Sequence, residues 1–214
     1  MIPLGDRQRR RRLPWATWAI AAACAGAFAW ELSLGERLPE TIARLAPSPA
    51  GIVALERPWS LPLRLLAAMF LHGGWLHLAG NLAFLLVFAD DVEAKLRPRR
   101  FLVLYLASGL VATLAQTAAT PRSSAPLVGA SGALAGVLGT FLVLFPRARL
   151  SGVLPLGCLV VPLRTRAFLF LPGWFLLQLA SALVAPPGAA GVAWYAHLAG
   201  FAAGPLVYAL IRRR

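Results

Sequence analysis

Residues 126–139 read Pro126-Leu-Val-Gly129-Ala-Ser131-Gly132-Ala-Leu-Ala-Gly136-Val-Leu-Gly139, a run of small and apolar residues that contains one hydroxyl. The apolar run continues to Phe145 and stops at Pro146, which a helix interior does not tolerate well. The pattern predicts a helix over 131–145 that begins at Ser131. The simplest explanation of this serine is a helix cap or a packing contact, because small residues four apart let membrane helices approach closely.

The composition is that of an integral membrane protein. The chain has 214 residues, of which 59% are hydrophobic, and its mean hydropathy is +0.70, which is more apolar surface than one soluble core can bury. The net charge of +13 does not indicate nucleic acid, because the basic residues fall in short clusters between apolar segments. We expect the lipid bilayer, with its charged surface, to be their partner. Cys24 and Cys158 form no metal-binding pattern.

Six apolar segments are close to the length that crosses a bilayer. They cover residues 15–33, 74–89, 101–118, 131–145, 168–184 and 192–211. The mixed segment 35–70 predicts a long, structured external loop, and 150–167, broken by glycine and proline, predicts an interfacial linker. Residues 1–13 and 212–214 are expected to be basic tails. The expected fold class is therefore an all-α membrane protein, a bundle of six transmembrane helices.

The basic residues predict the orientation of this bundle. All but five of the 21 Lys and Arg fall in the two tails and in the loops after the second and fourth predicted helices. The five exceptions are Arg37, Arg44, Arg57, Arg64 and Arg122. The positive-inside rule then predicts that both termini are cytoplasmic, and we expect a bacterial inner membrane.

Polar side chains inside the predicted spans are few, and in a bilayer each is a candidate for function. Counted from the cytoplasmic helix ends at ~1.5 Å per residue, Ser131, His77 and His197 lie about 21–23 Å above the inner boundary. In a hydrocarbon core of ~30 Å this puts all three roughly 8 Å beneath the outer boundary. Asn81 shares the helix face of His77, about one turn deeper. Three helices therefore present polar groups at one predicted level, which indicates a site.

These residue types favour acyl transfer. Ser131 becomes a nucleophile when a base such as neutral His197 accepts its proton. The oxyanion of the intermediate needs donors, which the Asn81 amide, a His77 N–H and the backbone N–H of Ser131 can supply. Glu31, the nearest carboxylate, is expected at a solvated helix end, so the prediction is a Ser-His dyad without an acid.

Other residues are given structural roles. Gly129 and Gly132 on one side and Gly200 and Gly204 on the other predict small-residue faces along which the fourth and sixth helices pack closely. His72 is expected to tie the external loop to the second helix by a hydrogen bond.

The remaining polar residues leave more room for interpretation. Asp90, Asp91 and Glu93 are interpreted as the solvated end of the second helix. Gln178 has two open interpretations, a hydrogen bond within the bundle or a place beside the substrate's entry.

Three motifs together resemble a known family. They are His72-Gly-Gly-Trp-Leu-His77-Leu-Ala-Gly-Asn81, Gly129-Ala130-Ser131-Gly132 and Ala196-His197-Leu-Ala-Gly200-Phe-Ala-Ala-Gly204. In this order across six predicted spans, they resemble the rhomboid intramembrane serine proteases over about residues 14–211. The resemblance implies cleavage of transmembrane protein substrates near the outer membrane face. It implies Ser131 as nucleophile, His197 as general base and acid, and His77, Asn81 and the Ser131 N–H as oxyanion hole, with no metal or cofactor.

Two positions depart from the family pattern. Arg64 matches the arginine of a Trp-Arg pair in the first external loop, but Leu63 precedes it, which questions how that loop is anchored. Ala135 stands where some members carry an aromatic residue that stacks on the base. Another residue, expected from the fifth helix, must then hold His197.

Two functions of different class remain. The first is a protease that cuts a single-pass helix at a small residue near its outer end, reached beneath a loop at 185–191. The second is a catalytically silent rhomboid-like scaffold that binds transmembrane helices. A metalloprotease is disfavoured because the chain lacks His-Glu-x-x-His, and a transporter because it shows no internal repeat.

Overall fold

The structure is a computed structural model, and it describes residues 1–6, 13–156, 159–184 and 191–212. The arginines of residues 7–12, Cys158 and all but the last residue of the expected 185–191 loop lie outside the described residues.

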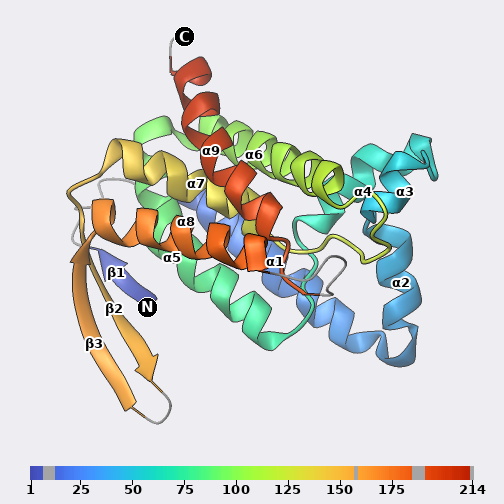
Figure 1. The fold of residues 1–214 in the computed structure, drawn as a ribbon, viewed down its shortest axis with the longest axis horizontal. Coiled ribbons are helices and arrows are strands. Elements are labelled where there is room, and N and C mark those ends of the chain that lie inside the picture. The colour runs from blue at the N-terminus through green and yellow to red at the C-terminus, as the bar shows by residue number, and fades with distance from the viewer. Residues whose placement is uncertain (7–12, 157–158, 185–190, 213–214) are drawn as a thin grey trace.

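Within the described residues, a bundle of six helices forms most of the structure (Figure 1). They are α1 (Trp15–Ser33), α5 (Trp75–Leu96), α6 (Pro98–Ala119), α7 (Ser131–Leu144), α8 (Ala167–Val184) and α9 (Trp194–Ile211). The central helix is α7, which contacts α5, α6, α8 and α9 and is buried without interruption from Ala133 to Phe141. Its small residues make this position possible, because they leave room for neighbours on every side.

Length and apolar composition mark the chain as a multi-pass membrane protein. Among the described helices, α5, α6, α8 and α9 are each long and apolar enough to cross a membrane. α1 qualifies together with the segment Gly35–Val53, from which it is separated by a bend of 114°. At ~1.5 Å per residue, the 14 residues of α7 span only about 21 Å, less than the ~30 Å of a bilayer core.

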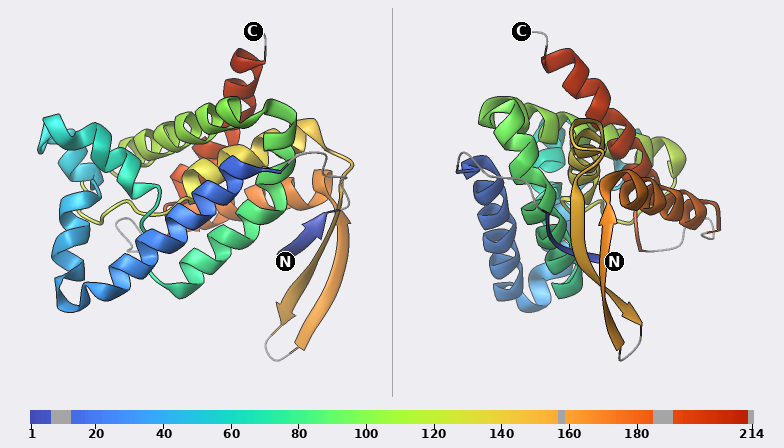
Figure 2. Two further views of the ribbon diagram at one scale, coloured as in Figure 1. Left: turned by 180° about the vertical axis from the view of Figure 1, so that it is seen from behind. Right: turned by 90° about the vertical axis from the view of Figure 1, so that its left-hand side faces the viewer.

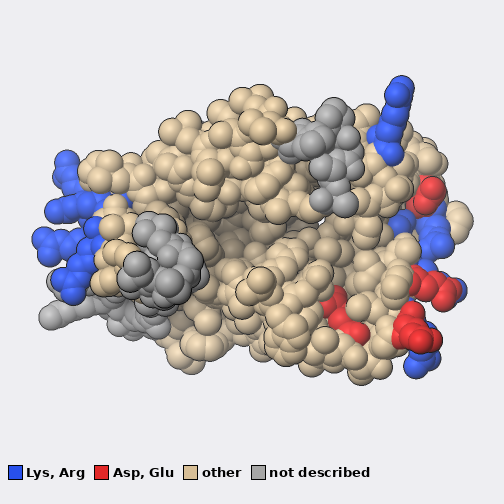
Figure 3. Space-filling view, turned by 60° about the horizontal axis from the view of Figure 1, so that its bottom comes forward, with Lys and Arg blue, Asp and Glu red and all other residues tan. Residues whose placement is uncertain are grey.

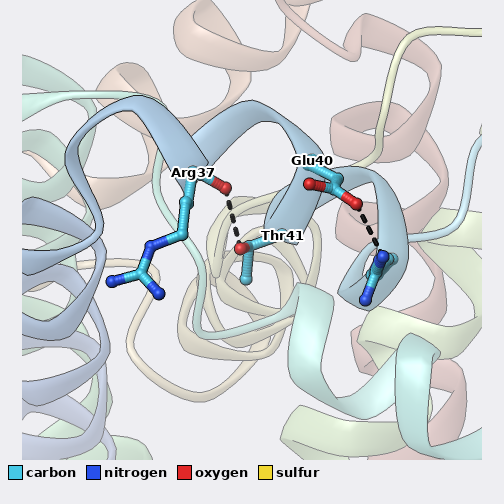
Figure 4. A network of polar contacts seen from close by, with 4 residues as sticks. Arg37, Glu40 and Thr41 are labelled. Atoms are coloured by element: carbon cyan, nitrogen blue, oxygen red, sulfur yellow. Dashed lines mark hydrogen bonds and ion pairs between the residues drawn. The ribbon is translucent and has the colours of Figure 1, made fainter.

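The segment after α1 is a chain of short helices rather than an irregular loop. These are the 3₁₀ turns η1 (Gly35–Arg37) and η2 (Pro58–Ser60) and the helices α2 (Leu38–Leu45), α3 (Pro49–Val53) and α4 (Leu61–Ala68). In α2 the Thr41 hydroxyl donates to the Arg37 carbonyl at 2.8 Å, and Arg44 pairs with Glu40 at 2.6 Å (Figure 4). Both charged side chains are exposed, so this ion pair contributes little stability.

Arg64 anchors this segment. Its side chain is buried, and its guanidinium donates to the carbonyl of Ala46 at 3.0 Å and to that of Glu56 at 3.3 Å. Burial is the main factor that lowers the pKa of Arg64. The Arg64 side chain therefore connects α4 to the ends of α2 and α3, and it does so with Leu63, not tryptophan, before it.

Residues 150–167 are not the interfacial linker that we predicted but most of a β-hairpin. β2 (Arg149–Leu156) and β3 (Leu159–Arg166) pair antiparallel, and β1 (Ile2–Asp6), within the expected N-terminal tail, pairs with β2. The hairpin extends away from the helices at one end of the bundle (Figure 1). Its prolines misled the prediction: Pro162 lies on edge strand β3, and Pro155 lies beyond the last β1 pairing at Val153, so neither occupies a fully paired position. The three strands are an addition to a mostly helical fold.

The predicted solvated end of the second helix is also wrong. α5 continues to Leu96, and Asp90, Asp91 and Glu93 are buried. The two carboxylate oxygens of Glu93 accept hydrogen bonds from the N–H groups of Ala16 (3.0 Å) and Thr17 (2.7 Å), and one of them also from the Thr17 hydroxyl (2.8 Å). Glu93 therefore caps the N-terminus of α1, which lies beside α5 (Figure 2).

Glu31 is not at a solvated helix end either. It is 1% exposed, and its carboxylate accepts a hydrogen bond from the backbone N–H of His72, with N–O distances of 3.0 and 3.3 Å. The contact ties the end of α1 to the segment before α5. A backbone donor far along the chain satisfies this carboxylate, and local sequence gives no sign of it.

Candidate active site

Ser131 and His197 meet where α7 and α9 begin. Ser131 is the first residue of α7, and His197 lies in the first turn of α9. The Nε2 atom of His197 is 2.9 Å from the Ser131 Oγ, a hydrogen-bond distance. The geometry therefore allows the imidazole to accept the hydroxyl proton.

Glycine contacts hold these two helices close. Gly200 lies against the backbone carbonyl of Gly132, and Gly204 against that of Gly136, so closely that a Cβ at either position would overlap the carbonyl oxygen. Such backbone contact between helices requires glycine. The small-residue faces thus bring Ser131 and His197 within reach of each other.

α5 contributes His77 and Asn81, which lie against Gly129, two residues before Ser131. Gly129 has a φ of +119°, which favours glycine, and a Cβ there would lie 2.7 Å from His77 Nε2 and 3.7 Å from Asn81 Nδ2. His77 Nδ1 accepts the N–H of Gly73 at 3.3 Å, so a neutral His77 carries its proton on Nε2. The Asn81 Nδ2 is buried and has no hydrogen-bond partner among the described residues.

A third donor comes from the backbone. Because α7 begins at Ser131, its N–H is one of the first amides of the helix, which have no acceptor within the helix. These amides also form the positive end of the helix dipole. Together with His77 Nε2 and Asn81 Nδ2, this N–H gives the site three donors suited to an oxyanion.

Gln178 is the site residue whose place the sequence left open. It lies on α8, is 6% exposed, and its Oε1 is 2.7 Å from His197 Nδ1. The rings of Trp174, also on α8, and Trp194 lie 6.0 and 6.2 Å from that of His197, measured between ring centres. The signal in the sequence was a lone amide in a strongly apolar helix, which needs a partner.

His72 lies outside the dyad. Its ring is buried 5.2 Å from that of His77, and its Nδ1 is 2.9 Å from the carbonyl of Phe70. Burial, with a smaller effect from nearby His77, lowers the pKa of His72 to about 4. His72 therefore packs behind His77 in its neutral form. No group of three or more His, Cys, Asp and Glu in the described residues could hold a metal ion.

A small cavity of about 40 Å³ adjoins Ser131 on the side of α6. Met69, Gln116 and Ala196 are among the residues that line it. This is room for about one water molecule. Gln116 is held there, since its Oε1 accepts the N–H of Ala196 at 3.2 Å.

Comparison with known proteins identifies the family of this chain. A family model described as the rhomboid domain matches residues 60–214, a range that includes all the site residues above. The chain belongs to the rhomboid family.

Individual relatives align over about half of the chain. It is 34% identical over 109 residues to RHOMBOID-like protein 5 of Arabidopsis thaliana, and 35% identical over 115 residues to Rhomboid protease GluP of Bacillus subtilis. It is also 34% identical over 92 residues to Inactive rhomboid protein 1 of Drosophila melanogaster. These alignments cover 51%, 54% and 43% of this chain but only 34%, 21% and 6% of the respective relatives. Both a named protease and a named inactive protein are thus among its relatives.

Proposed function

We propose that the protein is an intramembrane serine endopeptidase that hydrolyses peptide bonds in or near the transmembrane segments of membrane proteins. The observation that carries the proposal is the 2.9 Å contact between Ser131 Oγ and His197 Nε2 at the junction of two closely packed helices. An unpaired hydroxyl or imidazole would cost free energy in such an apolar bundle. Here the two groups are hydrogen-bonded to each other, as a serine nucleophile is to its general base.

The reaction uses the two side chains in turn. The Ser131 proton moves to His197 Nε2 as the Oγ–C bond forms at the scissile carbonyl, and His197 then gives that proton to the leaving amine as the C–N bond breaks. A water molecule then attacks the acyl carbon as His197 accepts its proton, and His197 returns that proton to Ser131 Oγ as the Oγ–C bond breaks. The cavity beside Gln116 is suited to supply that water.

Three donors stabilise the oxyanion in this proposal. They are the Nε2–H of His77, the amide of Asn81 and the backbone N–H of Ser131. The unpartnered Asn81 Nδ2 supports the assignment, because a buried donor costs free energy unless a ligand pairs with it.

We further propose six spans and cytoplasmic termini, with the shorter α7 as the fourth span inside the bundle. Among the charged side chains visible in Figure 3, those at one end of the molecule are basic, whereas the opposite end shows acidic and basic ones. Lys95 lies in the last turn of α5 and Arg100 in the first turn of α6, whereas Arg147 follows α7 and Arg164 lies on β3 shortly before α8. Ser131, at the other end of α7, then lies toward the outer face, where the substrate helix is cut.

The alternative is a silent scaffold that binds transmembrane helices without cutting them. A relative named inactive makes this class a real candidate. The presence of both Ser131 and His197 at bonding distance favours the protease.

A cleavage assay separates the two. Purified protein in detergent is incubated with a single-pass substrate that carries Gly and Pro near its outer end, and Ser131→Ala is compared with Ser181→Ala, a serine on α8. The protease predicts cleavage by wild type and Ser181→Ala but none by Ser131→Ala. Equal cleavage by wild type and Ser131→Ala refutes the assignment, and binding without cleavage by the wild type supports the scaffold.

A further inference from the structure

The side-chain amide of Gln178 on α8 is hydrogen-bonded to His197, although α8 needs no polar group to pack in the bundle. Apart from Gln178, the helix Ala167–Val184 has only Ser181 as a polar side chain. Gln178 is nevertheless buried, and its Oε1 lies 2.7 Å from the Nδ1 of His197, the ring nitrogen that faces away from Ser131. The imidazole is therefore held from both sides.

The contact with Gln178 determines which ring nitrogen of neutral His197 carries the hydrogen. A carbonyl oxygen only accepts hydrogen bonds, so the Nδ1 of His197 must carry the hydrogen when it faces Oε1. A neutral imidazole with its hydrogen on Nδ1 has a lone pair on Nε2, which faces the Ser131 hydroxyl. If the amide NH₂ faced Nδ1 instead, Nε2 would carry the hydrogen and could not accept the serine proton.

Other neighbours of His197 do not serve this purpose. The indoles of Trp174 and Trp194 contact its ring but do not bond either nitrogen. The ring of His77 on α5 is the titratable group near it, and Ser131 on α7 is its other polar partner. Ala135, at the position where some rhomboid proteins carry a stacking aromatic residue, has only a methyl group.

We propose that Gln178 is the positioning residue of the site, which holds His197 in the Nδ1–H tautomer so that Nε2 is ready to accept the Ser131 proton. Gln178 does with a neutral amide what the carboxylate does in a Ser-His-Asp triad. The proposal rests on the proposed function, in which His197 is the base. It assigns no contact between Gln178 and the substrate.

The first test requires no substrate. The chain has three histidines, so ¹⁵N-labelled histidine gives few NMR signals, and the signal of His197 is identified by its loss in His197→Ala. In the neutral wild type we expect Nδ1 protonated and Nε2 unprotonated, and in Gln178→Ala a mixture of tautomers. A wild-type ring protonated on Nε2, or an unchanged tautomer in Gln178→Ala, overturns the proposal even if the protein cleaves nothing.

The second test measures cleavage against pH in Gln178→Ala and Gln178→Glu. General-base catalysis contributes about 10²–10⁴-fold, and we expect Gln178→Ala to lower kcat by roughly tenfold to a hundredfold with little change in KM. In Gln178→Glu a carboxylate accepts the same Nδ1–H and stabilises the charged imidazolium, so the acidic limb of the kcat profile should move to higher pH.

The matched control is Leu177→Ala, an exposed neighbour on α8, which should leave kcat and the pH profile unchanged. A Gln178→Ala protein with wild-type kcat, or a Gln178→Glu protein whose acidic limb does not move, contradicts the positioning role. Cleavage that persists in Ser131→Ala would instead contradict the proposed function, and the NMR result would still decide the role of Gln178.

Discussion

Two glutamates show how single residues join distant parts of the chain. Glu31 and Glu93 are each 1% exposed; Glu31 accepts a hydrogen bond from one backbone N–H of another segment, and Glu93 from two. An amide nitrogen at a helix end or in a turn has no local acceptor, and a carboxylate satisfies it more strongly than a neutral group does. The two contacts fix both ends of α1 against α5 and the residues before it.

Removal of the Glu93 cap should destabilise the fold. In Glu93→Ala the N–H groups of Ala16 and Thr17 lose their acceptors, and a buried unpaired polar group costs about 1–3 kcal/mol. We expect Tm in detergent to fall in Glu93→Ala and to change little in Glu40→Ala, whose carboxylate is exposed. Equal Tm values for the two variants would show that the cap contributes nothing.

His72 should make the stability depend on pH. Its pKa is about 4 in the fold and about 6.5 in a free chain, so between these values the unfolded chain binds a proton that the folded one does not. Stability from His72 is therefore complete above about pH 6.5 and is lost as the pH falls toward 4. Between about pH 7.5 and about pH 4.5 the drop in Tm should be larger in wild type than in His72→Gln. Glu31 and His77, which also face His72, are kept in both proteins, so equal drops would contradict this prediction.

Among the elements, the contact of α7 with α9 determines the site. The sequence predicted small-residue faces on both helices, and it could do so because helical spacing is a local property. It did not predict which glycine faces which, since this depends on the crossing of the two helices. In the structure Gly204 lies on the carbonyl of Gly136 and Gly200 on that of Gly132.

Gly204→Ala should therefore separate α7 from α9. The added methyl overlaps a backbone carbonyl, and overpacking of this kind costs about 1–3 kcal/mol. We expect a lower Tm and reduced cleavage. Gly173→Ala on α8 is the control, because a Cβ there meets nothing within 4 Å. The packing account fails if both variants behave alike.

The hairpin is the element that sequence reasoning missed. Pro155, Pro162 and Gly152 were interpreted as breakers, although strands accept proline where no partner strand needs its N–H. β2 pairs with β1, which lies almost 150 residues earlier at the N-terminus. No local sequence pattern predicts such a non-local pairing. The same limit applies to Gln178, for which the sequence left open a hydrogen bond within the bundle or a place beside the substrate's entry and gave no partner.

For the molecule as a whole, the sequence predicts the helices and the family from local patterns. Hydrophobic segments and basic clusters are additive, local signals, so helices near the predicted ranges were within reach of prediction. The order of three motifs was enough to identify the family, which the rhomboid-domain match bears out. The arrangement of the segment between α1 and α5 around Arg64, by contrast, depends on bonds to the carbonyls of Ala46 and Glu56.

The proposed orientation predicts opposite accessibility of the two ends. In a background with Cys158 replaced by serine, Glu36→Cys and Arg164→Cys place exposed thiols at the two ends, while Cys24 is buried. A membrane-impermeant maleimide applied to intact bacterial spheroplasts should label Glu36→Cys alone, and both after lysis. Labelling of Arg164→Cys alone in intact spheroplasts would contradict the proposed orientation and indicate the opposite one.

The most direct measurement of the central claim is covalent labelling of the nucleophile. A fluorophosphonate reacts with a serine whose proton a base accepts, so mass spectrometry of the labelled wild type should find the adduct on Ser131. Labelling should be lost in His197→Ala and retained in Ser181→Ala. An adduct on another residue, or undiminished labelling of Ser131 without His197, would contradict the account.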